Sequence, residues 1–256
     1  MLRFNQIIYG PVHSRRLGLS LGVNLLPIDA KICSFNCIYC ECGFNTTMQE
    51  FRMPRPDEVK IALDETLREM SREGKFPDVI TFAGNGEPTL HPDFEEIIDN
   101  TILLRDLHCP SAKISVLSNS TKIHLPKVFS ALKKVDNNIM KFDSAIEHTM
   151  RLIDNPVSKQ TTVKWLIENL KKFEEQLVIQ TMFLRGEIDG EQIDNTTNKE
   201  VDAWIAALKE IRPRQVMIYS VDRETPVKNI QKIDVEQLNK IAEQARQQGF
   251  EVMAAG

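Results

Sequence analysis

Four of the five cysteines stand close together in this sequence, at a spacing that can hold a metal centre. Cys33, Cys37 and Cys40 follow the pattern C-x3-C-x2-C, Cys42 comes two residues later, and Cys109 is remote. Thiolates select iron–sulfur clusters, zinc or copper(I). Cysteine-ligated [4Fe–4S] clusters usually take four ligands, so three thiolates leave one iron open. An open coordination position is typical of metal sites that perform chemistry.

Two other interpretations of the cysteines predict no catalysis. A structural zinc site would use all four clustered thiols, but structural zinc ligands usually form two separated pairs. A non-catalytic iron–sulfur electron carrier would need a well-placed fourth cysteine. A disulfide framework is not expected, because the number of cysteines is odd and they are clustered. We expect Cys42 and Cys109 to be bystanders, which leaves too few thiols for a second cluster.

Further polar and flexible residues each follow a predicted strand. They are Gly84, Asn85, Gly86 and Glu87 after residues 78–82, Ser118 and Asn119 after residues 113–117, and Asp143 after residues 138–142. Glycine lets the backbone approach a ligand closely, glutamate can make a charge-assisted contact, and Ser, Asn and Asp suit sugar hydroxyl groups. The alternative is that these are ordinary turn residues.

Strand-like and helical segments alternate along the chain, which predicts parallel strands with helical crossovers. We expect residues 21–26 to form the first strand, residues 1–19 to precede it, and residues 31–43 to form the cysteine loop. About six or seven strand–helix units favour an α/β fold, a partial (β/α)6-type barrel in a single domain covering residues 1–256. Periodicity alone also allows an open doubly wound sheet. In both folds the reactive site lies at the C-terminal ends of the strands.

The cysteine motif, with Tyr39 directly before its third cysteine, resembles the signature of the radical S-adenosylmethionine (SAM) superfamily. The segment Gly84-Asn85-Gly86-Glu87-Pro88 is similar to that superfamily's Gly-Gly-Glu-Pro motif, with Asn85 inserted into the glycine pair. The resemblance covers nearly the whole chain. Residues 9–18 and 20–24 are similar to a bacterial and archaeal branch grouped with wyosine-type tRNA-modifying proteins.

This resemblance implies two cofactors, a [4Fe–4S] cluster and SAM. Cys33, Cys37 and Cys40 would hold the cluster, and SAM would chelate its open iron. An electron from an external donor of flavodoxin or ferredoxin type would cleave SAM to methionine and a 5′-deoxyadenosyl radical, which would take hydrogen from a substrate. The residues implied in SAM binding are Tyr39, Gly84, Asn85, Gly86, Glu87, Ser118, Asn119 and Asp143.

The composition limits which binding partners and which cellular location are expected. The 256 residues are 42% hydrophobic and 27% charged, with a formal net charge of −4, so a basic coat for nucleic acid is absent. No apolar run approaches the ~20 residues of a membrane span, and the N-terminus lacks the apolar core of a signal peptide. We expect a cytoplasmic protein that does not bind a membrane.

The substrate is open, although an anion is favoured. Arginine forks bind phosphate and carboxylate groups, and the alternative for each arginine is an ordinary solvated charge. The candidates are Arg15, Arg16, Arg185 and Arg223. The finer resemblance allows a tRNA base as substrate, and a partner protein, as for a glycyl-radical-enzyme activating protein, is the alternative.

Overall fold

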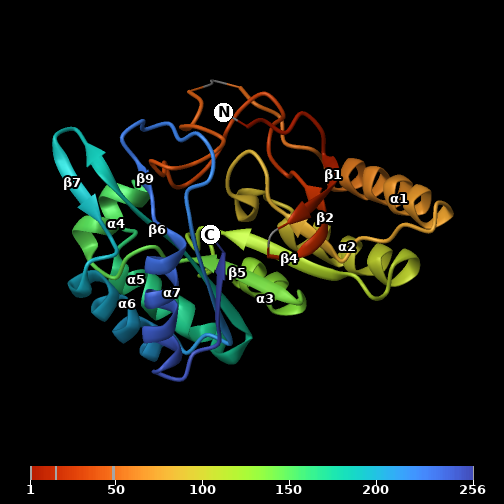
Figure 1. Ribbon diagram of the computed structural model, residues 1–256. Helices are drawn as coiled ribbons and strands as arrows, with labels where there is room; N and C mark the ends of the chain where they lie inside the picture. Colours follow the sequence, from red (N-terminus) through yellow and green to blue (C-terminus); the bar gives the residue numbers. More distant parts are fainter. Residues whose placement is uncertain (1, 15, 48–49, 256) are drawn as a thin grey trace.

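The computed structural model describes residues 2–14, 16–47 and 50–255. A curled sheet occupies the centre, and helices cover its outer face (Figure 1). In sheet order the strands are β1 (Ile8–Ser14), β2 (Gly18–Val23), β3 (Val79–Phe82), β4 (Lys113–Ser118), β5 (Asn137–Lys141), β6 (Leu177–Ile188), β8 (Gln215–Ser220) and β10 (Val252–Ala255). Every neighbouring pair from β2 to β10 is parallel. The predicted partial (β/α)6-type barrel is therefore confirmed.

Helices form the crossovers between the parallel strands. They are α1 (Pro56–Arg72), α2 (Phe94–His108), α3 (Pro126–Lys134), α4 (Glu147–Asp154), α5 (Val163–Leu170), α6 (Asn198–Ile211) and α7 (Val235–Arg246), with short 3-10 turns η1 (Pro88–Leu90) and η2 (Lys171–Gln176). In α1, proline opens the first turn, and apolar residues at helical spacing are buried on one face. Among the helices of the described segments, none is long and apolar enough to cross a membrane.

The N-terminal region differs from the expectation. Residues 1–19 do not simply precede the first strand, because β1 occupies residues 8–14 and forms an antiparallel hairpin with β2. The Gly10-Pro11 pair lies where the register of this hairpin is irregular. A proline within a strand-like sequence argues against a strand, which is why β1 was not expected. The strand expected at residues 21–26 lies at residues 18–23 instead. It ends there because the Asn24 side chain bonds the backbone of Leu26 in a local turn.

β6 continues past the parallel sheet, and two short strands pair with this last part of it. They are β7 (Glu191–Asp194) and β9 (Gln231–Lys232), both antiparallel to β6. The loops after the parallel strands gather at one end, at the top of Figure 1, where the orange cysteine loop meets the blue segment between β8 and α7. The backbone N–H of Val227 in that segment donates to the carbonyl of Ile38 at 3.3 Å.

The inner face of the curled sheet changes character along the strands. An apolar floor is formed by Ile139, Val178 and Met217, with Leu17, Leu117 and Met253 packed against them. Because side chains alternate along a strand, Lys141, Gln180 and Tyr219 also face inward, two residues nearer the C-terminal ends. The inner space therefore has an apolar floor and a polar mouth, and the cysteine loop lies at the mouth.

Candidate active site

Backbone hydrogen bonds hold the cysteine loop against the C-terminal ends of the strands. The N–H of Ile32 donates to the carbonyl of Asn85 at 2.9 Å, and the carbonyl of Ile32 accepts from the N–H of Glu87 at 3.1 Å. On the other side, the N–H of Ile38 donates to the carbonyl of Ile153 in α4 at 3.0 Å. The loop is thus fixed between the turn after β3 and the end of α4.

The three motif cysteines lie in a site that suits a metal cluster. Cys37 is buried, and Cys33 and Cys40 are half-buried. Burial, with a contribution from the Glu87 carboxylate, raises the pKa of Cys33 to about 11, and burial also raises the pKa of Cys37. Thiols that resist ionisation give up their protons when a metal ion binds them. The donor set therefore fits a group that brings its own positive charge.

In the described part of the chain, the site does not have the geometry of one that binds a single metal ion. No three His, Cys, Asp or Glu side chains within residues 2–14, 16–47 and 50–255 are arranged around one ion. An iron–sulfur cluster attaches each cysteine to a different iron atom, so its ligand sulfurs enclose a wider space than those of a mononuclear site.

The other two cysteines have different surroundings. The thiol of Cys42 donates to the carbonyl of Gly84 at 3.4 Å. The same thiol is also hydrogen-bonded to Cys40, and this hydrogen bond raises the pKa of Cys42 and lowers the pKa of Cys40. A Cβ on Gly84 would lie 2.2 Å from Oδ1 of Asn24, so this glycine permits close packing of the chain after β2. Cys109 follows α2 and belongs to the main apolar core.

Lys31 is a buried cation of the cysteine loop that sequence reasoning missed. It is 1% exposed, and its Nζ donates to the carbonyl of Gly43 at 2.6 Å. Its backbone N–H and carbonyl both bond Thr46 at 3.0 Å. Lys31 therefore joins the two ends of the loop and places a positive charge beside the thiols. A lone lysine before a cysteine motif carries no sequence signal for this role.

Glu87, Ser118 and Asn119 meet beside the first motif cysteine. The buried carboxylate of Glu87 accepts from the Ser118 hydroxyl at 2.8 Å and from the Asn119 backbone N–H at 2.6 Å. Burial raises the pKa of Glu87 even though these donors favour its charge. The amide of Asn119 donates to Ser34 Oγ at 2.8 Å and to Cys33 Sγ at 3.4 Å. These residues, expected from their places after different strands, thus lie together.

The remaining residues of the Gly-Asn-Gly-Glu segment pack against the protein itself. Gly86 has a φ of +137°, and a Cβ there would lie 1.8 Å from the carbonyl oxygen of Ile32. The fully buried Asn85 side chain donates to the carbonyls of Phe4 and Pro27 at 2.8 and 2.9 Å. The approach of Gly86 and Asn85 to SAM stays a prediction. The structure gives both a packing role that accounts for these residue types.

Tyr39 and Asp143 form a second polar group with two residues that sequence reasoning missed. The Tyr39 hydroxyl donates to Asp143 Oδ2 at 2.5 Å. Lys141 Nζ contacts Asp143 and Tyr39, and it lies 2.8 Å from Asp154. Burial opposes the charge of Lys141, but the two carboxylates outweigh it and raise its pKa. Lys141 ends a strand of two asparagines and two apolar residues, and neither it nor Asp154 at the end of α4 carries a sequence signal for this role.

Lys141 should be important for stability because it separates two buried carboxylates. Removing one partner of a buried ion pair typically costs about 3–5 kcal/mol. We expect Lys141→Met to lower the free energy of unfolding by that amount, measured by guanidinium denaturation. The double variant Lys141→Met/Asp154→Asn should recover part of the loss. Equal losses in the single and double variants would show that carboxylate repulsion is not the cause.

The four candidate arginines occupy different places. Arg15 lies outside the described residues. Arg16 lies at the polar mouth, with its guanidinium carbon 4.4 Å from the centre of the Tyr219 ring. Arg223 lies at the rim and is paired with Glu41 of the cysteine loop at 2.5 Å. Arg185 lines a separate cavity and does not meet the others.

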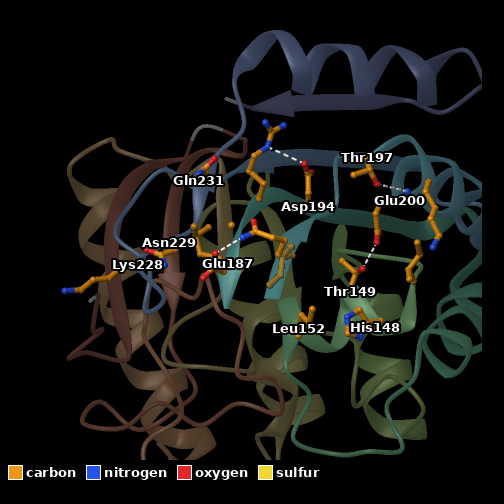
Figure 2. A pocket seen from close by; sticks show the side chains of 17 residues that line it. His148, Thr149, Leu152, Glu187, Asp194, Thr197, Glu200, Lys228, Asn229 and Gln231 are labelled. Atoms are coloured by element: carbon orange, nitrogen blue, oxygen red, sulfur yellow. Dashed lines mark hydrogen bonds and ion pairs between the residues drawn. The ribbon is translucent and has the colours of Figure 1, made fainter. Parts of the chain in front are cut away.

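That separate cavity has a volume of about 920 Å³ and lies between α4, the β6–β7 hairpin and β9. Figure 2 shows Glu200 bonded to Thr149 on one wall, with Lys228 and Gln231 on the other. None of the cysteines lines it. This cavity is therefore distinct from the site around the cysteine loop.

Comparisons with known proteins show which family the chain belongs to. A family model described as the radical SAM superfamily matches residues 28–199, more than half of the chain. A UPF0026 protein from Helicobacter pylori is 31% identical over 226 residues, covering 87% of this chain and 68% of that protein. A Brachyspira hyodysenteriae protein named GTPase Obg is 30% identical over 238 residues. The match covers 91% of this chain but spans only about a third, 32%, of that relative.

Solved structures show the same fold at low sequence identity. A radical SAM methyltransferase from Sphaerobacter thermophilus has a TM-score of 0.65 at 12% identity, covering 92% of this chain and 65% of that one. TYW1 with a lysine–pyruvate adduct bound has a TM-score of 0.60 at 15% identity, covering 89% of this chain and 73% of that one. The chain belongs to the radical SAM superfamily and to the family of UPF0026 proteins.

Proposed function

We propose that Cys33, Cys37 and Cys40 hold a [4Fe–4S] cluster in this chain and that SAM binds beside it. When bound, these cofactors supply reductive cleavage of SAM to methionine and a 5′-deoxyadenosyl radical that takes a hydrogen atom from an anionic substrate. The electron comes from an external donor of flavodoxin or ferredoxin type. Superfamily membership supports the chemistry, and the donor set supports the cluster.

The convergence of three sequence-distant segments at Cys33 carries this proposal. The cysteine loop, the turn after β3 and the turn after β4 are linked through Asn119, whose side-chain amide donates to Cys33 Sγ and whose backbone N–H donates to the Glu87 carboxylate. A buried carboxylate suits the amino group of SAM, and an amide N–H suits its carboxylate. We assign these roles to Glu87 and Asn119. Tyr39 and Asp143, on the other side of the loop, are assigned to the adenosine.

The experiment is spectroscopic and needs no substrate. The anaerobically reconstituted protein is reduced with dithionite, and its electron paramagnetic resonance (EPR) spectrum is recorded with and without SAM. We expect a reduced [4Fe–4S] signal that changes when SAM binds. Glu87→Gln should keep the iron content but require at least tenfold more SAM, whereas the surface variant Glu95→Gln should match the wild type. A full cluster that does not respond to SAM would refute the proposal.

Lys31 should make the cluster easier to reduce. Reduction adds negative charge, and a buried cation stabilises that charge far more than an exposed one does. We expect Lys31→Met to shift the reduction potential to a more negative value in a redox titration followed by EPR. Lys113→Met is the control, since its side chain is 63% exposed at the start of β4. An unchanged potential at full iron content would show that Lys31 only closes the loop.

A further inference from the structure

At the polar mouth, the guanidinium of Arg16 has no ion-pair partner among residues 2–14, 16–47 and 50–255. The turn between β1 and β2 is fixed by Ser14 Oγ, which accepts from the backbone N–H groups of Arg16 and Leu17 at 3.3 and 3.2 Å. Leu17 packs into the apolar floor, so the turn directs Arg16 to the inner side of the sheet. There the Nη1 of Arg16 is buried without a hydrogen-bond partner.

The neighbouring cations differ from Arg16 in this respect. Lys141 is matched by Asp143 and Asp154, and Arg223 is matched by Glu41. Within the part of the chain that the structure describes, no carboxylate forms an ion pair with Arg16. A buried charged donor without an acceptor is costly. The presence of an arginine at this position is explained if an anion binds to its guanidinium.

A small cavity adjoins the guanidinium. It has a volume of about 60 Å³, and its walls include Arg16, Tyr39, Met182 and Tyr219, with Arg223 and the acidic residues Glu41 and Asp222 also lining it. One water needs only ~10–15 Å³ of such space, so the cavity admits a group of several heavy atoms. Stacking on Tyr219 leaves the edge of the guanidinium free for a planar or tetrahedral anion. Because Tyr39 directly precedes Cys40, the cavity lies beside the cysteine loop.

The acidic surroundings select against a large polyanion. Asp143, Asp154 and Glu41 stand around the mouth, and the whole chain has a net charge of −4. A polyanion would meet these carboxylates along its length, whereas a single small group would meet only Glu41 and Asp222, which line the cavity together with Arg16 and Arg223. The arrangement therefore favours a small molecule over a nucleic acid.

We propose that Arg16 binds the carboxylate or phosphate group of a small-molecule substrate on the inner face of the half-barrel, beneath the cysteine loop. The role as a substrate rests on the proposed function, while the anion site itself stands on the geometry around Arg16. The anion forms charge-assisted hydrogen bonds with the guanidinium and thereby holds the rest of the molecule toward the mouth.

The test is a binding titration followed by nuclear magnetic resonance (NMR). The reconstituted holoprotein carries methionine labelled with ¹³C in its methyl group, and the methyl signals are recorded as each probe is added. Met182 lines the cavity, Met217 lies in the floor, and Met70 in α1 is a remote reference. The probes are inorganic phosphate and acetate, with uncharged acetamide as the matched control for acetate, all at constant ionic strength. We expect saturable shifts of the Met182 or Met217 methyl signal with phosphate or acetate, and none with acetamide.

Two variants separate the site from general effects of charge. Arg16→Gln should weaken anion binding at least tenfold while keeping the iron content and the EPR response to SAM. Arg214→Gln, exposed and bonded to Asn137 at the opposite end of the sheet, should bind like the wild type. No saturation in the wild type, equal saturation in Arg16→Gln, or an equal response to acetamide would overturn the anion site. Anion binding without any response to SAM would instead overturn only the proposed function.

Discussion

Cys37→Ala is expected to abolish cluster binding, whereas Cys109→Ala leaves a full cluster. Both residues are buried cysteines, at 8% and 4% exposure, but only Cys37 belongs to the loop at the mouth of the half-barrel. With Cys37 replaced, two motif thiolates remain, too few to hold a cluster that already has one open iron. The measurement is the iron and sulfide content per chain after anaerobic reconstitution, together with the visible absorbance of the cluster.

The same assay tests the choice of ligands within the loop. Cys33→Ala and Cys40→Ala should behave like Cys37→Ala. Cys42→Ala should keep the iron, because we assign Cys42 no bond to the cluster. Its thiol is hydrogen-bonded to Gly84 and Cys40. Equal iron loss in Cys37→Ala and Cys109→Ala would contradict the assignment, and loss in Cys42→Ala would make Cys42 a ligand.

Gly86→Val should both destabilise the protein and disturb the cysteine loop. A side chain at Gly86 would meet the carbonyl oxygen of Ile32 at 1.8 Å, in a backbone conformation with φ of +137°. Overpacking typically costs ~1–3 kcal/mol, and a strained backbone adds ~1–3 kcal/mol. We therefore expect a loss of about 3 kcal/mol or more in guanidinium unfolding, with less iron bound after reconstitution.

Gly74→Val is the matched control for this clash. Gly74 also has a positive φ, +67°, but a Cβ there meets nothing within 4 Å. It should carry the backbone strain alone and keep its iron. If both variants lost the same stability and both kept a full cluster, the contact between Gly86 and Ile32 would not be what positions the loop.

The sequence was sufficient to predict the sheet and the cysteine loop because both depend on local patterns. Alternating apolar runs placed most parallel strands, and the spacing of Cys33, Cys37 and Cys40 is local as well. Residues directly after strands, such as Glu87 and Asn119, could be expected to meet because parallel strands end at one edge.

The rest depends on contacts between distant segments, which one sequence does not reveal. The β1–β2 hairpin brings Arg16 under the mouth from the N-terminal side, although nothing near Arg16 in the sequence indicates Tyr219 as its neighbour. Asp154 meets Lys141 only because α4 packs beside the loop. The approach of Gly86 to SAM stays a prediction, and its close approach to the backbone of Ile32 is a contact that the sequence did not indicate.

The most direct test of the central claim is the measurement of 5′-deoxyadenosine. The reconstituted protein, with full iron content, is incubated anaerobically with SAM and dithionite, and the products are quantified by chromatography and mass spectrometry. We expect equimolar methionine and 5′-deoxyadenosine from the wild type and none from Cys37→Ala. A fully loaded cluster that takes up electrons but leaves SAM intact would contradict it and would favour an iron–sulfur electron carrier.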